Sequence, residues 1–418
     1  MPLRFRENGW SGGQYSLFRM ALGLYLLVHF AQLVPWGKEV FSSEGALPDG
    51  SASPLLHLFP NVLALWDGPV FVTAFLAIAV LFSGFFIAGY GDRPAAVVLW
   101  YILACLNGRN PLIANPSLPF LGWILLAHSF LPRAPYGSWS ARSRTDPAAG
   151  WRMPPALFAA AWVVMSVAYT YSGYTKLVSP SWLDGTALER ILLNPLARPT
   201  FLRDAILSLP HEALHLGTWL ALGMELLFAP LALLRRARPW IWYLMLVMHV
   251  GLLLLIDFSD LTLGMILLHL FTFNPEWIRP LAATTETLFY DGNCGLCHGL
   301  VRFVIAEDRA GTAFRFAPQQ GKAFRAAVRS DGGAELPNSV VVRTEDGSLL
   351  TRSAAVLHIL MRLGGYWRLI GYLVAAIPSG VGDLIYAAVA RTRYRLFGRP
   401  SDTCPLLPPG LHQRFEDI

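Results

Sequence analysis

The chain has 418 residues, of which 54% are hydrophobic and 14% are charged, and its mean hydropathy is +0.45. This composition excludes a single water-soluble domain, which carries about 25% charged residues. The net charge of +6 comes from basic residues that lie between apolar runs and form no patch with interleaved aromatic residues, so we expect no nucleic-acid partner.

Charge density rises near residue 280. Residues 1–280 include 33 charged ones, whereas the much shorter stretch 281–418 includes 27. Such a shift is typical of a boundary between a membrane-embedded part and a water-exposed part. The sequence therefore predicts a mainly α-helical transmembrane domain over residues 1–280 and a small α/β domain over residues 281–418.

The first domain contains eight apolar segments that are candidate transmembrane helices, although a span needs about 20 residues and some segments are shorter. They lie at residues 16–35, 69–90, 94–106, 117–131, 155–175, 213–234, 239–256 and 259–273. We expect a polytopic bundle of about eight spans in a lipid bilayer. No cleavable signal peptide is expected, because Arg4, Arg6 and Glu7 precede the first segment and no small-residue cleavage site follows it.

Basic residues in the connections predict the orientation of the bundle. With a cytoplasmic N-terminus, the inner connections hold Arg4, Arg6, Arg93, Arg133, Arg142, Arg144, Arg152, Arg235, Arg236 and Arg238, and the outer ones hold Lys38, Arg109, Lys176, Arg190, Arg198 and Arg203. Because positive charge favours the inside, an even number of spans places the second domain in the cytoplasm. We expect an integral protein of a bacterial inner (plasma) membrane.

Ionisable side chains at membrane depth cost free energy and indicate a function or a polar cavity. The first domain has His29, His128, Lys176, Glu225, His249, Asp257, Asp260 and His269. We expect some of them to line a cavity. Asp257 and Asp260 also suit an aqueous turn, and His29 and His128 suit the membrane interface. Lys176, Glu225 and His249 are the candidate site residues, and the alternative for Lys176 is a lysine that snorkels to the surface at a helix end.

The segments Tyr171-Ser-Gly-Tyr-Thr-Lys176 and Ser181-Trp182-Leu-Asp184-Gly185 resemble the signature of the HTTM domain, the membrane region shared with vitamin K-dependent gamma-carboxylase. Leu17-Phe18-Arg19 and the stretch 225–273 agree, so the resemblance covers about residues 10–280. It implies that Lys176 is a base, and an apolar pocket would favour its free amine. No counterpart of the carboxylase's lumenal domain is recognised, so we expect a quinone or lipid pocket and not carboxylation.

The second domain opens with a strand and a thiol motif. The stretch 286–290 predicts a strand, and Asp291-Gly-Asn-Cys294-Gly-Leu-Cys297 leads into a helix that ends near Ile305. Four cysteines, Cys105, Cys294, Cys297 and Cys404, are too few for a disulfide scaffold and indicate thiol chemistry. A helix N-terminus stabilises a thiolate. Cys294 is therefore the predicted nucleophile, with its sulfur presented to solvent, and Cys297 is the resolving thiol.

The motif beginning at Tyr290 resembles the Y-D-G-x-C-x-x-C of the DCC family of thiol-disulfide oxidoreductases, a thioredoxin-like group. Predicted strands at 314–316, 339–343 and 349–350, a helix at 353–363, and the tail features Ile385-Tyr386, Arg393-Tyr394-Arg395-Leu-Phe397-Gly398-Arg399 and Cys404 agree with it over about residues 286–407. The resemblance implies a thioredoxin-like fold that requires no cofactor.

Three further residues are candidates for the thiol site. In thioredoxin-like folds a proline, usually cis, precedes the third strand and faces the thiols, and Pro337 is in that position, although it is equally an ordinary turn proline. Asp291 either caps the helix or relays a proton. Cys404 is either a third thiol or an ordinary buried cysteine.

The thiol motif has three other interpretations. It could be a c-type haem attachment site, because His298 follows Cys297, or a zinc site completed by His298 and Cys404. It could also be an inert remnant of a redox site. We expect no metal. The stretch 363–390 is apolar for a soluble domain and is followed by four arginines, Arg391, Arg393, Arg395 and Arg399. It is expected either to lie against membrane or headgroups or to pack on the sheet.

Three functions follow. The leading hypothesis is a membrane-bound thiol-disulfide oxidoreductase in which Cys294 attacks a disulfide of a protein or small-molecule redox partner and Cys297 resolves the mixed disulfide. The second is a Lys176-dependent quinol or lipid oxygenase or carboxylase-like enzyme with the thiol domain as its reductant. The third is a non-enzymatic, membrane-anchored redox sensor.

Overall fold

The computed structural model describes residues 8–113, 115–281, 284–331, 336–400 and 408–417, and the chain divides into two compact units. The helical unit contains Phe18–Leu131 and Pro154–Phe273. The sheet unit contains Glu7–Leu17, Pro132–Met153 and Asn274–Ile418. The C-terminal part of the chain is thus joined in one unit by two earlier segments.

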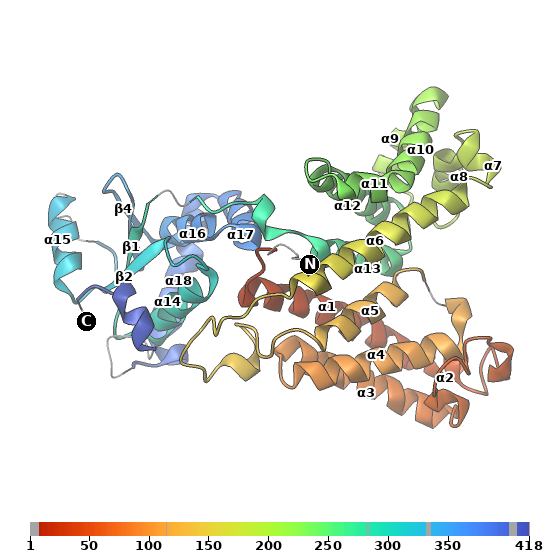
Figure 1. Cartoon of the computed structure of the whole chain (residues 1–418), viewed down its shortest axis with the longest axis horizontal. Coiled ribbons are helices and arrows are strands. Elements are labelled where there is room, and N and C mark those ends of the chain that lie inside the picture. The colour runs from red at the N-terminus through yellow and green to blue at the C-terminus, as the bar shows by residue number, and fades with distance from the viewer. Residues whose placement is uncertain (1–7, 114, 282–283, 332–335, 401–407, 418) are drawn as a thin grey trace, which may run out of the picture. The chain divides into compact units, whose positions relative to one another are not determined.

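The helical unit is built from α-helices and a few short 3-10 helices (η). Its elements are α1 (Gly12–Leu33, shared with the sheet unit), η1 (Val34–Trp36), α2 (Gly37–Phe41), η2 (Gly50–Ala52), η3 (Val62–Ala64), α3 (Pro69–Ala88), α4 (Asp92–Arg109), η4 (Pro111–Ile113), α5 (Leu118–His128), α6 (Pro155–Lys176), α7 (Pro180–Leu183), α8 (Ala187–Leu192), α9 (Phe201–Leu207), α10 (His211–Leu226), α11 (Phe228–Leu233), α12 (Arg238–Leu255) and α13 (Ser259–Thr272). Helix α4 packs between α3 and α5, and α13 contacts α5, α6 and α12 (Figure 1).

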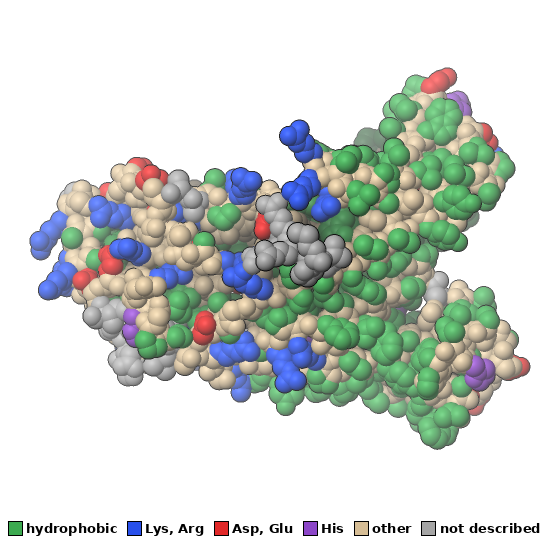
Figure 2. All heavy atoms as spheres, viewed as in Figure 1, with side chains coloured by type: hydrophobic (Ala, Val, Ile, Leu, Met, Phe, Trp, Pro, Cys, Tyr) green, Lys and Arg blue, Asp and Glu red, His purple; other side chains and the backbone are tan. Residues whose placement is uncertain are grey.

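In the part of the chain that the structure describes, four single helices are long and apolar enough to cross a membrane: Gly12–Phe41, α3, α6 and α12. Of the eight predicted spans, four therefore coincide with helices that are long and apolar enough to cross a membrane. The other four predicted segments are helical too, but α5, α10 and α13 have only 11, 16 and 14 residues, and α4 carries Asp92, Arg93 and Arg109 within its 18 residues. Hydrophobic side chains cover much of the helical unit's surface seen in Figure 2.

The sheet unit contains one mixed four-stranded sheet. Its strands are β1 (Glu286–Tyr290), β2 (Phe314–Pro318), β3 (Val341–Arg343) and β4 (Leu349–Thr351), in the order β2-β1-β3-β4. Strand β1 is parallel to β2 and antiparallel to β3, and β3 is antiparallel to β4. The sequence predicted all four strands, because each is a short apolar run between turn residues.

Helices cover both faces of this sheet. Alternate residues of a strand point to opposite faces, so each strand contributes side chains to the core on either side. The helices are α14 (Gly295–Glu307), α15 (Lys322–Ser330), α16 (Arg352–Leu363), α17 (Gly365–Ala375) and α18 (Ser379–Phe397), with η5 (Trp139–Ala141), η6 (Pro275–Trp277) and η7 (Pro409–Arg414). On one face Leu288 and Phe316 share a core with Val304 of α14. On the other, Phe289 packs against Phe324 of α15. The thiol motif therefore begins a helix that is held by the main core.

A buried carboxylate holds the separate segments of the sheet unit together. Glu307, the last residue of α14, accepts hydrogen bonds from the Ser11 hydroxyl and from the indole N–H of Trp367. Burial raises the pKa of Glu307, and these donors only partly offset that effect. The segment 132–153 is held by the neighbouring turn of α14, where Arg302 donates to the carbonyl of Thr145 at 3.2 Å.

Replacing Glu307 with alanine would leave the buried donors of Ser11, Gly13 and Trp367 without this acceptor. Because each unsatisfied buried donor costs about 1–3 kcal/mol, we expect the free energy of unfolding of the sheet unit to fall by roughly 3 kcal/mol. Thermal unfolding of the purified full-length protein measures this as a lower midpoint. The exposed Glu345→Ala variant is the control and should unfold like the wild type. Equal midpoints for both variants would contradict the role of Glu307.

Candidate functional site

The thiol motif forms the first turn of α14. Cys294 is the N-cap residue, with an extended backbone (φ −123°, ψ 115°), and its sulfur accepts the N–H of Cys297 at 3.3 Å. The turn before it is closed by Asp291, whose carbonyl accepts the N–H of Cys294 at 3.2 Å and whose carboxylate accepts that of Asn293 at 3.0 Å. The N–H of Cys297 and the positive end of the helix dipole therefore act on the Cys294 sulfur, and both stabilise a thiolate.

The two thiols differ in acidity. A hydrogen bond from the Cys297 thiol, the backbone N–H of Cys297 and the charge of Arg393 outweigh burial and lower the pKa of Cys294 to about 6. The same thiol–thiol bond, together with burial, raises the pKa of Cys297 far above its usual range. At neutral pH the pair therefore holds a thiolate at Cys294 and a proton at Cys297.

A buried ion pair adjoins the thiols. Arg393 of α18 lies 3.2 Å from the Asp291 carboxylate and donates to the side-chain oxygen of Asn338 at 2.7 Å. Asp291 also accepts from the Tyr394 hydroxyl at 2.5 Å and from the Gln320 amide at 3.1 Å. Burial alone would raise the pKa of Asp291, but these bonds and the charge of Arg393 hold it below its usual range. An ionised Asp291 fits an anchor for Arg393 better than a proton donor.

Cys294 is fully buried, which corrects the expectation that its sulfur is presented to solvent, and Cys297 is only 8% exposed. The C-terminal end of α18 covers the motif. The N–H of Gly295 donates to the carbonyl of Gly398 at 3.3 Å, and a Cβ at residue 295 would lie 2.1 Å from the carbonyl oxygen of Phe397. Only glycine fits at this crossing. The cause is the path of a distant segment, which the local motif does not reveal.

The remaining predicted thiol-site residues have different outcomes. Pro337 precedes β3, but no cis peptide bond occurs in the described residues, so the expected cis proline is wrong, and it is Asn338 that contacts Arg393. Cys404 lies outside the described residues. His298 donates from Nε2 to the carbonyl of Gly292 at 2.9 Å. Across the described ranges, no three or more His, Cys, Asp or Glu side chains gather as a metal site.

Three of the predicted membrane-domain residues come together at the end of α6. The Lys176 ammonium forms an ion pair with Glu225 and donates to the Ser172 hydroxyl at 2.8 Å. It also lies 5.0 Å from the ring centre of Trp182. Gly173 permits this contact of α6 with α10, because a Cβ there would lie 3.0 Å from the Cβ of Glu225. As an ammonium, Lys176 has no lone pair, so in this arrangement it acts as a hydrogen-bond donor.

His249 belongs to a different buried group of the helical unit. The Tyr169 hydroxyl lies 2.8 Å from Nε2 of His249 and 3.4 Å from Nδ1 of His269. Nothing in the sequence marks Tyr169 as a member of this group, because a tyrosine in an apolar helix carries no distinctive signal. Asp184 joins neither group: its exposed carboxylate accepts the N–H of Thr186 at 2.9 Å.

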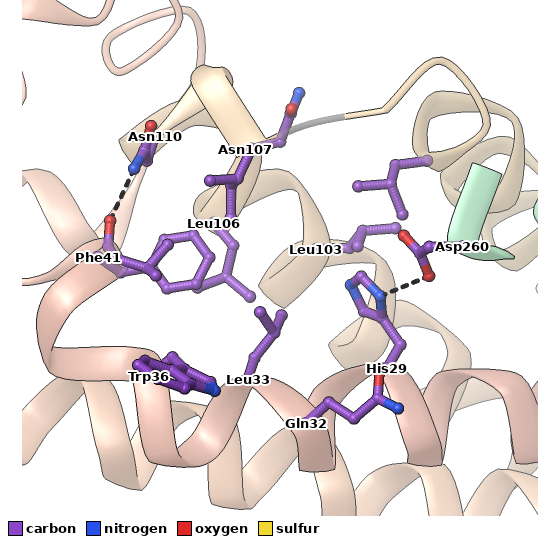
Figure 3. A pocket seen from close by; sticks show the side chains of 13 residues that line it. His29, Gln32, Leu33, Trp36, Phe41, Leu103, Leu106, Asn107, Asn110 and Asp260 are labelled. Atoms are coloured by element: carbon purple, nitrogen blue, oxygen red, sulfur yellow. Dashed lines mark hydrogen bonds and ion pairs between the residues drawn. The ribbon is translucent and has the colours of Figure 1, made fainter. Parts of the chain in front are cut away.

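A cavity of about 370 Å³ lies elsewhere in the helical unit (Figure 3). His29 and Asp260 are part of its wall, and Nδ1 of His29 lies 3.0 Å from the Asp260 carboxylate. The other side of that carboxylate accepts from Asn115 at 2.5 Å. The expectation that some ionisable residues at membrane depth line a cavity is confirmed for this pair.

Several residues of the thiol site escaped the sequence analysis. Arg393 and Tyr394 were noted as part of a tail pattern, yet nothing in that pattern indicated that they contact Asp291. Asn338 and Gln320 carry no local signal. Their proximity to the motif depends on the sheet, which brings the segments after β2 and before β3 to the end of β1.

Comparisons with known proteins concern the same part of the chain. The DCC1-like thiol-disulfide oxidoreductase family matches residues 288–399. The uncharacterized protein YuxK of Bacillus subtilis (strain 168) is 34% identical over 130 residues, which are 31% of this chain and 93% of that protein. The chloroplastic DCC family protein At1g52590 of Arabidopsis thaliana is 32% identical over 136 residues, which are 31% of this chain and 78% of that protein. No solved structure matches the chain.

The match includes both cysteines of the motif, Asp291 and Arg393, so the family comparison and the geometry concern the same site. Through this C-terminal region, the chain belongs to the DCC1-like thiol-disulfide oxidoreductase family.

Proposed function

We propose that the protein is a membrane-bound thiol-disulfide oxidoreductase with Cys294 and Cys297 as its catalytic pair. The observation that carries this proposal is the position of Cys294 at the N-cap of α14, where its sulfur accepts the N–H of Cys297 at 3.3 Å. This arrangement and the thiol–thiol bond lower the pKa of Cys294 to about 6 and leave the proton on Cys297. A thiolate is the attacking group of disulfide exchange, and a neighbouring thiol completes it. The strand order β2-β1-β3-β4, with the motif between β1 and α14, also supports a thioredoxin-like domain.

The exchange conserves atoms and electrons. The Cys294 thiolate attacks one sulfur of a substrate disulfide, the substrate S–S bond breaks, and the first substrate thiolate leaves and takes a proton from solvent. Cys297 then loses its proton and attacks the Cys294 sulfur of the mixed disulfide. The second substrate thiol leaves, and the Cys294–Cys297 disulfide remains. Because Cys294 is buried, a bulky disulfide reaches it only when the end of α18 moves away.

Membrane insertion of the helical unit is supported by its four long apolar helices and by the apolar side chains on its surface. The composition of the sheet unit adds an argument about topology. Residues 7–17, 132–153 and 274–418 form one compact unit, so they belong on one side of the bilayer. On this arrangement the chain crosses the membrane an even number of times between residues 18 and 131. It also crosses an even number of times between residues 154 and 273. With the arginine distribution, that side is the cytoplasm of a bacterial cell.

A second candidate function concerns the helical unit. The contact among Lys176, Glu225 and Trp182 supports a site of the HTTM type in which a quinol or lipid reacts and the sheet unit restores the reduced state. In this proposal His249 would belong to a separate group around Tyr169.

Replacing Cys294 with serine removes the attacking thiolate, and we expect reduction of a soluble disulfide by the full-length protein to fall by about 10³-fold or more, because an alcohol is not ionised at neutral pH. Cys297→Ser should instead accumulate a mixed disulfide with the substrate, which mass spectrometry detects. Cys105→Ser is the control, since Cys105 lies in α4, and should retain full activity. Wild-type activity in Cys294→Ser would refute the proposed nucleophile.

The thiolate of Cys294 should titrate with a midpoint near pH 6, so that it is present above and lost below this pH. Ultraviolet thiolate absorbance, as a difference from Cys294→Ser, measures this without requiring access to the buried sulfur. Cys297→Ala removes the largest stabilising bond, and its midpoint should rise towards the ordinary value of about 8.5. A midpoint that is the same in both proteins would contradict the thiol–thiol bond as the cause.

Single cysteines in a chain whose native cysteines are replaced by serine test the topology. Asp346→Cys in the β3–β4 turn and Ser143→Cys in the segment 132–153 are both exposed in the sheet unit, whereas Asp204→Cys lies in α9 of the helical unit. A membrane-impermeant maleimide should label only Asp204→Cys on intact cells and all three after lysis. If the maleimide labelled one of the two sheet-unit positions on intact cells but not the other, they could not lie on the same side of the membrane.

A further inference from the structure

An apolar cavity adjoins the thiol pair within the sheet unit. It has a volume of about 380 Å³ and lies among α14, α16, α17 and α18, of which α16 contacts the other three. Its wall is almost wholly aliphatic, and Leu300, Val356, Ile385 and Val389 contribute to it. Cys297 forms part of the same wall. The volume is at the lower end of the range of about 300–1,000 Å³ that small-molecule sites occupy.

Two hydrogen-bond donors stand among these apolar residues. Arg393 lines the cavity and is 3% exposed, and its Nε has no hydrogen-bond partner among the residues that the structure describes. A buried guanidinium N–H without an acceptor is costly, so an acceptor on a ligand would stabilise it. The hydroxyl of Tyr386, also in the wall, accepts the N–H of Val340 at 2.9 Å, and this bond leaves its own hydrogen free to donate.

The helices that form part of the cavity wall also expose apolar side chains on the surface of the protein. Helices α17 and α18 meet at a bend of 112° and together are long and apolar enough to count as one broken span. Leu373, Leu384 and Leu396 are among their exposed side chains. A molecule that reaches the cavity past Leu373 and Leu384 meets apolar side chains, which suits a ligand dissolved in the bilayer.

We propose that this cavity binds a lipid-soluble quinone and that the thiol pair reduces it; this inference rests on the proposed oxidoreductase function. A quinone ring is apolar on both faces and carries two carbonyl oxygens that accept hydrogen bonds from Arg393 and Tyr386. Glutathione disulfide does not fit, because its carboxylates would be desolvated against aliphatic walls. A lipoyl disulfide fits less well, because sulfur is a weak acceptor for the two donors.

The reaction transfers two electrons. The S–H bond of Cys297 breaks, an S–S bond forms between Cys297 and the Cys294 thiolate, and the quinone accepts the two released electrons. One proton comes from Cys297 and one from solvent, so that both quinone carbonyls become hydroxyls. The products are the Cys294–Cys297 disulfide and a hydroquinone.

The test uses the reduced full-length protein in lipid nanodiscs, mixed with decylubiquinone after the reductant is removed. Quinone absorbance and titration of the remaining thiols should show one quinone reduced for each thiol pair lost. Ile385 lines the cavity with a side chain that is 54% exposed, so Ile385→Asp places a carboxylate at the edge of the cavity. It should slow quinone reduction roughly tenfold or more, because an ionised group disfavours an apolar ligand. Leu384→Asp, the neighbouring exposed position outside the cavity, is the matched control and should react like the wild type.

Reduction of hydroxyethyl disulfide by the same samples separates this inference from the proposed function. Equal disulfide reduction by both variants, with quinone reduction lost only in Ile385→Asp, supports the quinone site. Disulfide reduction without any quinone reduction overturns the quinone inference and leaves the oxidoreductase function standing. Reduction of lipoamide but not of the quinone likewise overturns it in favour of a dithiolane ligand. If neither disulfide nor quinone is reduced, both proposals fail.

Discussion

The buried ion pair between Asp291 and Arg393 is the interaction on which the thiol site depends. Asp291 directly follows β1 and begins the turn into the motif, whereas Arg393 belongs to α18 and also binds Asn338 ahead of β3. Because each charge would be uncompensated without the other, at a cost of about 3–5 kcal/mol, the pair holds these three parts in one arrangement. The arginine of that arrangement also contributes to the low pKa of Cys294. Structure and acidity therefore have a common origin here.

The sequence predicted the secondary structure of the sheet unit well, where short apolar runs alternate with turn residues. It missed α15, a nine-residue amphipathic helix whose contacts with the core under the sheet come from Ala323, Phe324 and Ala327. In the helical unit, hydropathy located the helices but not their ends. Where a helix ends is set by turns such as that at Leu227 between α10 and α11, and by charges such as those within α4, which an apolar average does not resolve.

The candidate site was predictable only as far as it is local. Cys294, Cys297 and Asp291 lie within seven consecutive positions, so their spacing alone indicates thiol chemistry at a helix start. Arg393 comes 102 positions after Asp291, and Glu225 comes 49 positions after Lys176. No periodicity connects residues so far apart. The burial of Cys294 also depends on residues far away in the sequence, because the backbone that covers Gly295 comes from residues 397 and 398.

The three-segment composition of the sheet unit has a consequence for how the protein is made. Ser11 leaves the ribosome long before Glu307, its partner 296 positions later, and every helix of the helical unit is synthesised between them. The short N-terminal segment must therefore wait, without its final contacts, while those helices are synthesised. The sheet unit can close only when synthesis is nearly complete, so the two thiols reach their final surroundings only in chains whose helical unit has already been synthesised.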